Sequence, residues 1–529
     1  MHERIVMEEE SIGIRLLKKG KHGIYKGIFS RIGIILLFFL IQTFILVGIY
    51  VKFQSFIPYY TVISSSFVII MLLYLFNVEM NSSAKMTWMA VIMIVPIFGA
   101  ALLLYTKMDL GHRALKYRLN KIISNTKKTI PQNPATIERL AKEDEGMVAI
   151  GKYLSRSGCF PVYENSGVTY FKSGEEKFKE LLVQLRKAKK YIFLEYFIID
   201  EGEMWGKVLE ILAEKVKEGV DVRVMYDGTC EMSLLPHNYP KMLKKLGIKC
   251  RIFAPLTPFF STLYNYRDHR KILIIDGHTA FTGGINLADE YINKIDRFGH
   301  WKDTAVMIKG NAVKSFILMF LQMWNMYERI PEFEKYLNYD IKKKYATKGF
   351  VIPYGDIPLD DDKVGEIVYM DILNRATKYV HIMTPYLILD GEMETALKFA
   401  AERGVDVKII LPGIPDKKYA FALAKTHYAS LLASGVKIYE YTPGFVHAKV
   451  FVSDDIKAVV GTINLDYRSL YHHFECATYM YKTECISDIE EDFNETLNKC
   501  KQITKENVRK EKARIKIVGK LLKIISPLM

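Results

Sequence analysis

The sequence has little cysteine, and its cysteines are not spaced for metal binding or redox exchange. Six occur in 529 residues, at positions 159, 230, 250, 476, 485 and 500. No two of them form a Cys-x-x-Cys pair, so neither a zinc cluster nor a thioredoxin-type site is indicated. We therefore interpret them as reduced, structural thiols.

Acidic residues are fewer than basic ones. The chain has 74 Lys and Arg against 59 Asp and Glu, a formal net charge of +15. This surplus predicts a polyanionic partner, which is either nucleic acid or an anionic membrane surface. The charge by itself does not choose between them.

Three long apolar stretches lie in the first hundred residues, at 32–51, 56–78 and 86–106. Each has about the 20 residues that a helix needs to cross a bilayer. A cleaved signal peptide is not indicated, because the first stretch begins late and two more follow it. We predict a membrane-anchored protein.

The topology of these stretches is constrained by basic flanks. Lys and Arg cluster before residue 32 and after residue 106. The positive-inside rule places both clusters on the cytoplasmic side, whereas three full spans would separate them. Pro96 and Gly99 weaken a straight helix, so the third stretch is our preferred re-entrant segment.

From about residue 150, short strands rich in β-branched residues alternate with amphipathic helices. The strands are expected at 223–225, 271–275, 407–411 and 449–452, and two of the helices at 178–189 and 392–403. Strands that alternate with helices are typical of α/β layers. The fold class predicted is α/β, a mixed sheet flanked by helices.

This α/β part is an internal repeat. Gly-Val-Asp-Val-Arg-Val at 219–224 recurs as Gly-Val-Asp-Val-Lys-Ile at 404–409, and His447 and Asn464 follow His269 and Asn286 by the same 178 residues. We predict a basic segment (1–28), a transmembrane region (29–106), a linker (107–150), a first domain (151–338), a linker (339–362), a second domain (363–500) and a basic amphipathic tail (501–529).

The tail contains nine Lys or Arg and two Glu, interleaved with aliphatic residues. One interpretation is a solvated terminal helix. The other is an interfacial helix that lies on anionic lipid. The sequence supports both equally.

The chemistry is carried by two His-x-Lys-x4-Asp motifs, each followed by Gly-x-x-Asn at the same offset. Their residues are His269, Lys271, Asp276 and Asn286, and His447, Lys449, Asp454 and Asn464. On a strand, His and Lys two residues apart share a face. Each half therefore presents an imidazole beside an ammonium group, and the Asn adds an amide donor for phosphate oxygens.

Two imidazoles that face one phosphate permit a two-step transfer through a covalent phosphohistidine. One His attacks phosphorus, and the other protonates the leaving alcohol. The lysines supply positive charge, so we expect neither a metal nor a cofactor. The nucleophile needs an acceptor on its second ring nitrogen, for which Asp303 and Glu475 are candidates.

The motif aspartates are expected to have a different role from the histidines and lysines. Asp276 and Asp454 lie an odd number of residues from their histidines, so on a regular strand they face away. We expect them to support the motif more than to take part directly in the chemistry.

The paired motifs resemble those of the phospholipase D superfamily, and the chain as a whole resembles bacterial cardiolipin synthases. The resemblance includes Tyr-Asn-Tyr-Arg-Asp-His at 264–269, Gly-Gly-Ile-Asn-Leu-Ala-Asp-Glu-Tyr at 283–291 and Asn-Leu-Asp-Tyr-Arg-Ser at 464–469. It implies a duplicated phospholipase D-like domain in which both halves share one site. All six motif residues, Asp276 and Asp454 included, would be catalytic.

The resemblance also implies a reaction. Two phosphatidylglycerol molecules would exchange a phosphatidyl group to give cardiolipin and glycerol in a multi-pass bacterial cell-membrane protein. The expected partners are phosphatidylglycerol and anionic membrane lipid, without nucleic acid. The side of the membrane, the oligomeric state and the identity of the nucleophile stay open, with a lean to His269.

Three alternatives compete with this interpretation. A phospholipase would use water as acceptor, and the motifs do not separate it from a transferase. A nuclease of the same superfamily fits the charge but not the apolar stretches. A non-catalytic lipid-binding scaffold does not explain two intact motifs.

Overall fold

The structure is a computed structural model that describes residues 57–107, 110–126, 128–236, 238–255, 266–328, 330–337, 345, 347–360 and 362–528, with several residues between 40 and 51. The chain divides into two compact units. The α/β unit lies within Leu115–Leu256 and Tyr264–Gly519, and the helical unit within Lys21–Ala114 and Lys520–Met529.

The first sheet of the α/β unit has the strand order β1-β9-β7-β6-β2-β3-β4. Strands β2, β3 and β4 are parallel, and the remaining neighbours are antiparallel. The bounds are β1 Gly167–Phe171, β2 Tyr191–Tyr196, β3 Asp221–Asp227, β4 Lys249–Phe253, β6 Lys271–Ile275, β7 Thr279–Gly283 and β9 Ala305–Lys309. Alternate side chains of β6 enter two different cores, so both faces of this sheet are buried.

The second sheet repeats this order as β10-β17-β16-β15-β11-β12-β13, with β18 added at its edge. Its strands are β10 Phe350–Asp356, β11 Tyr379–Met383, β12 Asp406–Pro412, β13 Lys437–Tyr441, β15 Val450–Ser453, β16 Lys457–Gly461, β17 His473–Tyr481 and β18 Cys500–Ile503. The same order in both sheets is the structural counterpart of the sequence repeat.

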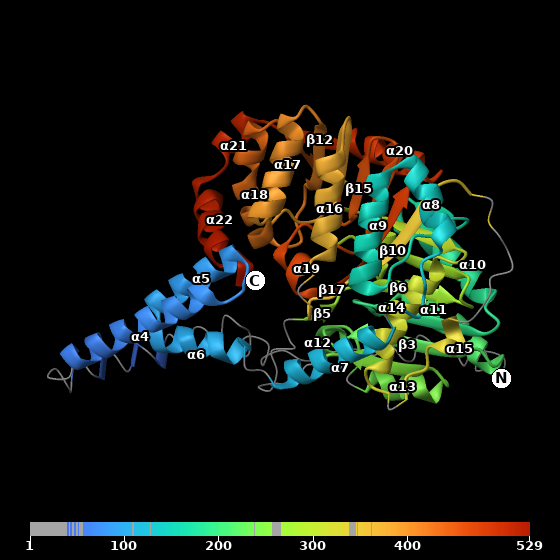
Figure 1. The fold of residues 1–529 in the computed structure, drawn as a ribbon, viewed down its shortest axis with the longest axis horizontal. Coiled ribbons are helices and arrows are strands. Elements are labelled where there is room, and N and C mark those ends of the chain that lie inside the picture. The colour runs from blue at the N-terminus through green and yellow to red at the C-terminus, as the bar shows by residue number, and fades with distance from the viewer. Residues whose placement is uncertain are drawn as a thin grey trace, which may run out of the picture. The chain divides into compact units, whose positions relative to one another are not determined.

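Helices cover the two sheets, and Figure 1 shows α16, α17 and α18 in one row on the second half. The larger helices are α10 Gly174–Arg186, α11 Glu203–Lys217, α13 Tyr239–Lys245, α14 Val313–Asn325, α16 Val364–Arg375, α17 Gly391–Glu402, α18 Lys418–Ala433 and α20 Ile486–Leu497. Polar caps begin several of them. The side chains of Ser173 and Asp390, for example, accept backbone N–H groups of the first turns of α10 and α17.

Helices also fill the segment for which we predicted a linker at 107–150. They are α7 Leu110–Thr126, α8 Pro134–Glu143 and α9 Glu145–Gly158. Short elements complete the unit: α12 Cys230–Ser233, η3 Asp289–Ile292, α15 Glu334–Leu337 and α19 Tyr467–Tyr471.

The α/β architecture predicted from the sequence is confirmed. The expected strands correspond to β3, β6, β12 and β15, and the two expected helices to α10 and α17. Local periodicity was sufficient here because each of these elements buries a regular apolar face.

Two short parallel ribbons join the halves. β5 (Arg267–Asp268) of the first half pairs with the start of β17, and β14 (Gly444–Val446) of the second half pairs with β8 (His300–Lys302). A buried ion pair lies beside the second ribbon, where Lys302 Nζ is 2.6 Å from Asp492 Oδ1 of α20. Tyr170 donates to the same carboxylate at 2.6 Å.

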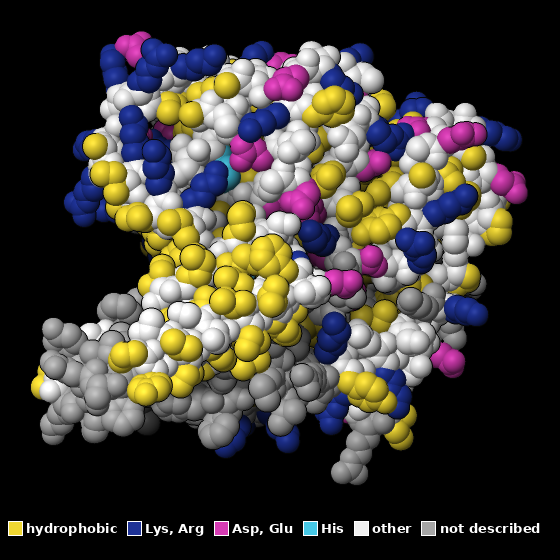
Figure 2. Space-filling model, turned by 60° about the vertical axis from the view of Figure 1, so that its left-hand side comes forward, with side chains coloured by type: hydrophobic (Ala, Val, Ile, Leu, Met, Phe, Trp, Pro, Cys, Tyr) yellow, Lys and Arg dark blue, Asp and Glu magenta, His cyan; other side chains and the backbone are white. Residues whose placement is uncertain are grey.

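The helical unit contains α4 Ile57–Asn77, α5 Ser82–Ile94 and α6 Pro96–Lys107. Among the described residues, one helix is long and apolar enough to cross a membrane, over Pro58–Asn77 with a mean hydropathy of 1.9. Figure 2 shows the hydrophobic side chains gathered on this unit. The stretch at 32–51 lies largely outside the described residues.

The third apolar stretch is broken. A Cβ at Gly99 would lie 3.1 Å from the Cα of Ile92, which requires the chain to fold back at Pro96. The two pieces have 13 and 12 residues, too short for a bilayer that takes about 20. The break lies at the proline for which we preferred this stretch as the re-entrant segment, because proline removes a helical hydrogen bond and crowds the preceding turn.

The end of the chain begins within the sheet and continues as helix. Residues 500–503 form β18, and α21 Lys505–Lys510, α22 Ala513–Ile525 and η4 Ser526–Leu528 follow. α22 buries Gly519 and exposes Ile517, Leu521 and Ile524. One face of this helix is thus apolar and uncovered, as an interfacial helix requires.

The ion pair between Lys302 and Asp492 gives a test of how the halves are held together. Asp492→Leu should destabilise the protein by roughly 3–5 kcal/mol, because the buried ammonium loses its carboxylate. Adding Lys302→Met should recover most of this loss, since no unpaired charge is then buried. Urea unfolding measures both.

The exposed pair of Lys172 with Glu495, which also lies on α20, is the matched control. Glu495→Ala should cost less than about 1 kcal/mol, because solvent screens this pair. If the double variant with Asp492→Leu and Lys302→Met were as unstable as Asp492→Leu alone, the loss of stability would not come from an unpaired Lys302.

Candidate active site

His269 is placed by a strand of the other half. It follows β5, whose Arg267 and Asp268 lie opposite His473 and Phe474 of β17. The backbone N–H of His269 donates to the carbonyl of Phe474 at 2.9 Å. The first motif histidine is thus held on the second sheet.

His447 is placed in the reciprocal way. It follows β14, whose Phe445 and Val446 lie opposite Trp301 and Lys302 of β8. Its backbone N–H donates to the carbonyl of Lys302 at 2.7 Å. The two ribbons therefore bring both motif histidines to the junction between the halves.

Each imidazole meets a fully buried carboxylate of the opposite half. His269 Nδ1 is 2.9 and 3.0 Å from the two oxygens of Glu475, and His447 Nδ1 is 2.6 Å from Asp303 Oδ2. A carboxylate accepts the Nδ1–H, which leaves Nε2 of each ring for a substrate. The sequence identified both carboxylates as candidates, but not that each one serves the other half.

The two motif lysines lie beside the histidines and are about 1% exposed. Each Nζ donates to the carbonyl of its own motif histidine, at 2.5 Å for Lys271. Burial lowers the pKa of Lys271 to about 8 and that of Lys449 to about 7. In the unliganded site Lys271 therefore keeps its charge up to about pH 8 and Lys449 up to about pH 7.

The same positive surroundings act on the imidazoles. Burial, reinforced by Lys271 and Lys449, holds the pKa of His269 well below its usual range. Burial and Lys449 lower the pKa of His447 to about 4, although Asp303 opposes the shift. Both rings are thus neutral in the unliganded site, and a negatively charged ligand would raise their pKa values.

The two motif asparagines differ in their surroundings. Asn286 is committed to the protein: its Oδ1 accepts the N–H of Ile198 at 3.0 Å and its Nδ2 donates to Tyr291 at 2.7 Å. The Oδ1 of Asn464 is buried and has no hydrogen-bond partner among the described residues. We expected the two asparagines to have equivalent roles. Of the two, only Asn464 has a side-chain oxygen without a hydrogen-bond partner among the described residues.

A second difference lies beside the carboxylates. A Cβ at Gly284 would lie 2.1 Å from Asp303 Oδ1, so only glycine lets this carboxylate pack against the backbone. At the matching position, Thr462 donates its hydroxyl to Glu475 instead. The duplicated frame therefore holds its two carboxylates by different means.

The motif aspartates lie at the opposite ends of their strands from the histidines. Asp276 accepts the N–H groups of Lys189, Lys190 and Tyr191 at 2.7–3.0 Å. Asp454 accepts those of residues 377, 378 and 379 at 2.7–2.9 Å. These contacts fasten the start of β2 and β11 and do not bring the carboxylates to the imidazoles. The catalytic role implied by the family resemblance does not fit this placement.

Sequence reasoning missed two buried residues at the site. Lys177 of α10 is 1% exposed and donates to Tyr196 and to the Ile285 carbonyl, and burial lowers its pKa to about 7. The helix that we predicted began at residue 178, so Lys177 lay outside it and was not recognised as a residue of the buried face of α10. His473 lies two residues before Glu475, and strand alternation was the available signal.

Among the residues that the structure describes, two groups of side chains have a spacing that fits a metal ion. They are His269, His473 and Glu475, and Glu366, Asp390 and Glu392. The ammonium groups of Lys271 and Lys449 act on the first group and oppose a cation there. The second group lies at the starts of α16 and α17, and Lys363 already lies 3.5 Å from Glu366.

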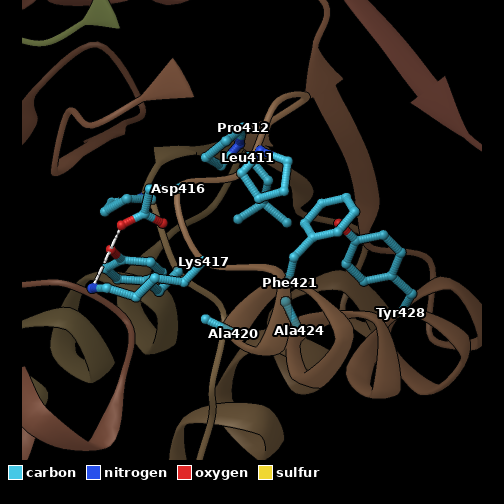
Figure 3. Close-up of a pocket in the computed structure, with 11 residues that line it drawn as sticks. Leu411, Pro412, Asp416, Lys417, Ala420, Phe421, Ala424 and Tyr428 are labelled. Atoms are coloured by element: carbon cyan, nitrogen blue, oxygen red, sulfur yellow. Dashed lines mark hydrogen bonds and ion pairs between the residues drawn. The ribbon is translucent and has the colours of Figure 1, made fainter. Parts of the chain in front are cut away.

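A small apolar pocket, with room for little more than a water molecule, lies in the second half. Figure 3 shows Leu411, Pro412, Phe421 and Tyr428 around it, with Asp416 and Lys417 at one side. Tyr386 donates to Asp416 at 2.6 Å and accepts from Lys417 at 3.0 Å. The charge of Lys417 also contributes to the low pKa of His269.

Two like sheets that share one His–Lys site define a phospholipase D-like protein. The fold is similar to that of phosphatidylserine synthase from Haemophilus influenzae, with a TM-score of 0.54 and 16% identity over 70% of this chain and 95% of that one. At this identity the likeness concerns the fold alone.

The sequence comparisons identify the family. A model described as cardiolipin synthase, PLD-like domain, matches residues 181–324 and 369–497. A cardiolipin synthase of Halalkalibacterium halodurans is 32% identical over 85% of this chain and 90% of its own length. An uncharacterized protein of Streptococcus mutans is 59% identical over 86% of this chain and 99% of its own length. The chain belongs to the cardiolipin synthase family.

The low lysine pKa values predict the pH dependence of turnover. For the free enzyme, kcat/KM with a phosphodiester lipid should fall as pH rises through about 7, where Lys449 loses its proton and its charge. Lys449→Arg stays charged, so its alkaline limb should move to about pH 8, set by Lys271. If the alkaline limb of the pH profile were unchanged in Lys449→Arg, the charge of Lys449 would not be what limits turnover.

The placement of Asp454 predicts an effect on stability and not on chemistry. Asp454→Asn offers one acceptor oxygen in place of two, which leaves a strand-starting N–H unpaired and costs roughly 2–4 kcal/mol. Urea unfolding measures this, with the exposed neighbour variant Asp455→Asn as control. A folded Asp454→Asn protein without turnover would show that the carboxylate takes part in the reaction.

Proposed function

We propose that this protein is a cardiolipin synthase that transfers a phosphatidyl group from one phosphatidylglycerol to a second, giving cardiolipin and glycerol. The observation that carries this proposal is the pair of buried imidazoles, each held at Nδ1 by a carboxylate of the other half, at 2.6–3.0 Å. Family membership supplies the substrate class.

In the first step, His269 Nε2 attacks phosphorus and the bond from phosphorus to the headgroup glycerol breaks. His447 gives a proton to the departing glycerol oxygen, and a phosphatidyl-histidine forms on His269. The very low pKa of His269 favours it as the nucleophile, because an attacking imidazole must be neutral. Glu475 accepts its Nδ1–H and stabilises the positive charge that develops on the ring.

In the second step, a hydroxyl of another phosphatidylglycerol replaces the glycerol. His447 removes its proton, the oxygen attacks phosphorus and the phosphorus–nitrogen bond breaks. Asp303 supports this acid–base exchange, because its own pKa is lowered by His447 and Lys449 and it stays ionised. The negative phosphate opposes the lowered pKa of His447, so this ring can carry the proton when substrate is bound.

Positive charge stabilises the transition state. Lys271 and Lys449 face the phosphate from both halves. The amide NH2 of Asn464, whose Oδ1 has no hydrogen-bond partner among the described residues, is suited to donate to it. Because these groups are buried, their interaction with developing charge is stronger than in water. Asn286, Asp276 and Asp454 support the backbone around them.

The lipid nature of the substrate agrees with the apolar helices of the helical unit. α4 is suited to span the bilayer and the α5–α6 pair to enter it without crossing, while a multi-pass arrangement that includes 32–51 stays a prediction.

Product analysis tests the function. The full-length protein in mixed micelles should convert phosphatidylglycerol with labelled headgroup glycerol into cardiolipin and free glycerol. His269→Ala and His447→Ala should each lower turnover by roughly a thousandfold or more, since each removes a reacting group. His278→Ala, on the β6–β7 turn, is the control.

Phosphatidic acid as the sole product would replace the transferase with a hydrolase. In His447→Ala, supplied with phosphatidylglycerol that carries its label in the phosphatidyl group, label should accumulate on His269, because attack on the covalent intermediate lacks its base. Label on no residue, or near-normal turnover of either alanine variant, would show the two-histidine mechanism to be wrong.

A further inference from the structure

His473 is a third imidazole at the junction between the halves. It begins β17, two residues before Glu475, and side chains two apart on a strand point to the same face. His473 therefore projects toward His269, as Glu475 does. It is 7% exposed.

The contacts of this ring are unusual for a buried polar group. Its centroid lies 5.2 Å from that of His269 and 6.4 Å from that of Phe197. Its Nδ1 is 3.5 Å from Glu475 Oε1, which is longer than a normal hydrogen bond. Neither ring nitrogen has a hydrogen-bond partner among the residues that the structure describes.

The other half has an equivalent of His473. The residues that precede His447 pair with β8, where Trp301 and Lys302 are followed by Asp303. The residues that precede His269 pair with β17, where His473 and Phe474 are followed by Glu475. Trp301 therefore occupies the position that His473 has in the other half. Trp301 lies 5.4 Å from His447, and its Nε1 likewise has no described partner. Each half thus places an unpartnered nitrogen beside the imidazole that the other half contributes.

A buried nitrogen without a partner costs stability unless a ligand completes its bonding. The ligand expected here is an anion, because Lys271, Lys449 and Lys417 all act on the adjoining His269. Burial also lowers the pKa of His473 to about 3, so its neutral ring adds no charge of its own. A neutral ring still offers one N–H donor.

We propose that His473 is a further substrate-contacting residue, whose ring N–H donates to a non-bridging oxygen of the phosphate at His269, as Trp301 Nε1–H does beside His447. This inference rests on the proposed function for the identity of the ligand as a phosphodiester. It assigns His473 no proton transfer and no covalent bond. Its effect is to hold the phosphate and to stabilise charge on its oxygens.

Inhibition by inorganic phosphate tests the contact apart from lipid binding. In the full-length protein, His473→Phe keeps a ring against His269 but has no donor. Its inhibition constant for phosphate should rise about tenfold or more, the usual effect of losing a hydrogen bond to a charged group, and kcat/KM for phosphatidylglycerol should fall in parallel. His473→Gln, which keeps an amide donor, should recover part of both.

His472→Gln is the matched control, since His472 caps the end of α19 just before β17 and its ring packs edge-on against Tyr266. It should bind phosphate as the unmodified protein does. Phosphate inhibition unchanged in His473→Phe would overturn the proposal. Equal losses in the Phe and Gln variants would also overturn it, because they would indicate packing and not donation. Absence of cardiolipin with normal phosphate binding would count against the proposed function alone.

Discussion

Each catalytic imidazole of this protein depends on a carboxylate from the other half of the chain. The partners are separated by 206 residues for His269 and Glu475 and by 144 for His447 and Asp303. Because all four groups are buried, neither half can orient its own histidine without the other. The parallel ribbons β5–β17 and β8–β14, and the buried ion pair of Lys302, keep the halves in this arrangement.

The duplicated frame carries unequal chemistry. Both sheets have the same strand order, but residues at matching positions differ. The Oδ1 of Asn286 accepts a backbone hydrogen bond, whereas that of Asn464 has no partner among the described residues. Gly284 and Trp301 of the first half correspond to Thr462 and His473 of the second. A two-step transfer needs one attacking ring and one acid–base ring. Unequal surroundings are how two like motifs acquire those separate roles.

The site has a large electrostatic cost when it is unliganded. Three buried lysines near the imidazoles have pKa values lowered to about 7 or 8, since burial disfavours their charged form. An anionic phosphate relieves this cost and also raises the pKa of His447. Binding of substrate thereby prepares both the charge and the proton that the reaction uses.

The sequence by itself determined the α/β class, the repeat, the motif lysines and histidines and the two candidate carboxylates. These depend on local spacing, because strand and helix periods place neighbours on known faces. Parity along the strand also indicated that Asp276 and Asp454 face away. Only the tertiary structure decided that the carboxylates cross between halves and that Lys177 and His473 adjoin the site. Such contacts join segments far apart in the chain, and no local period records which of them meet.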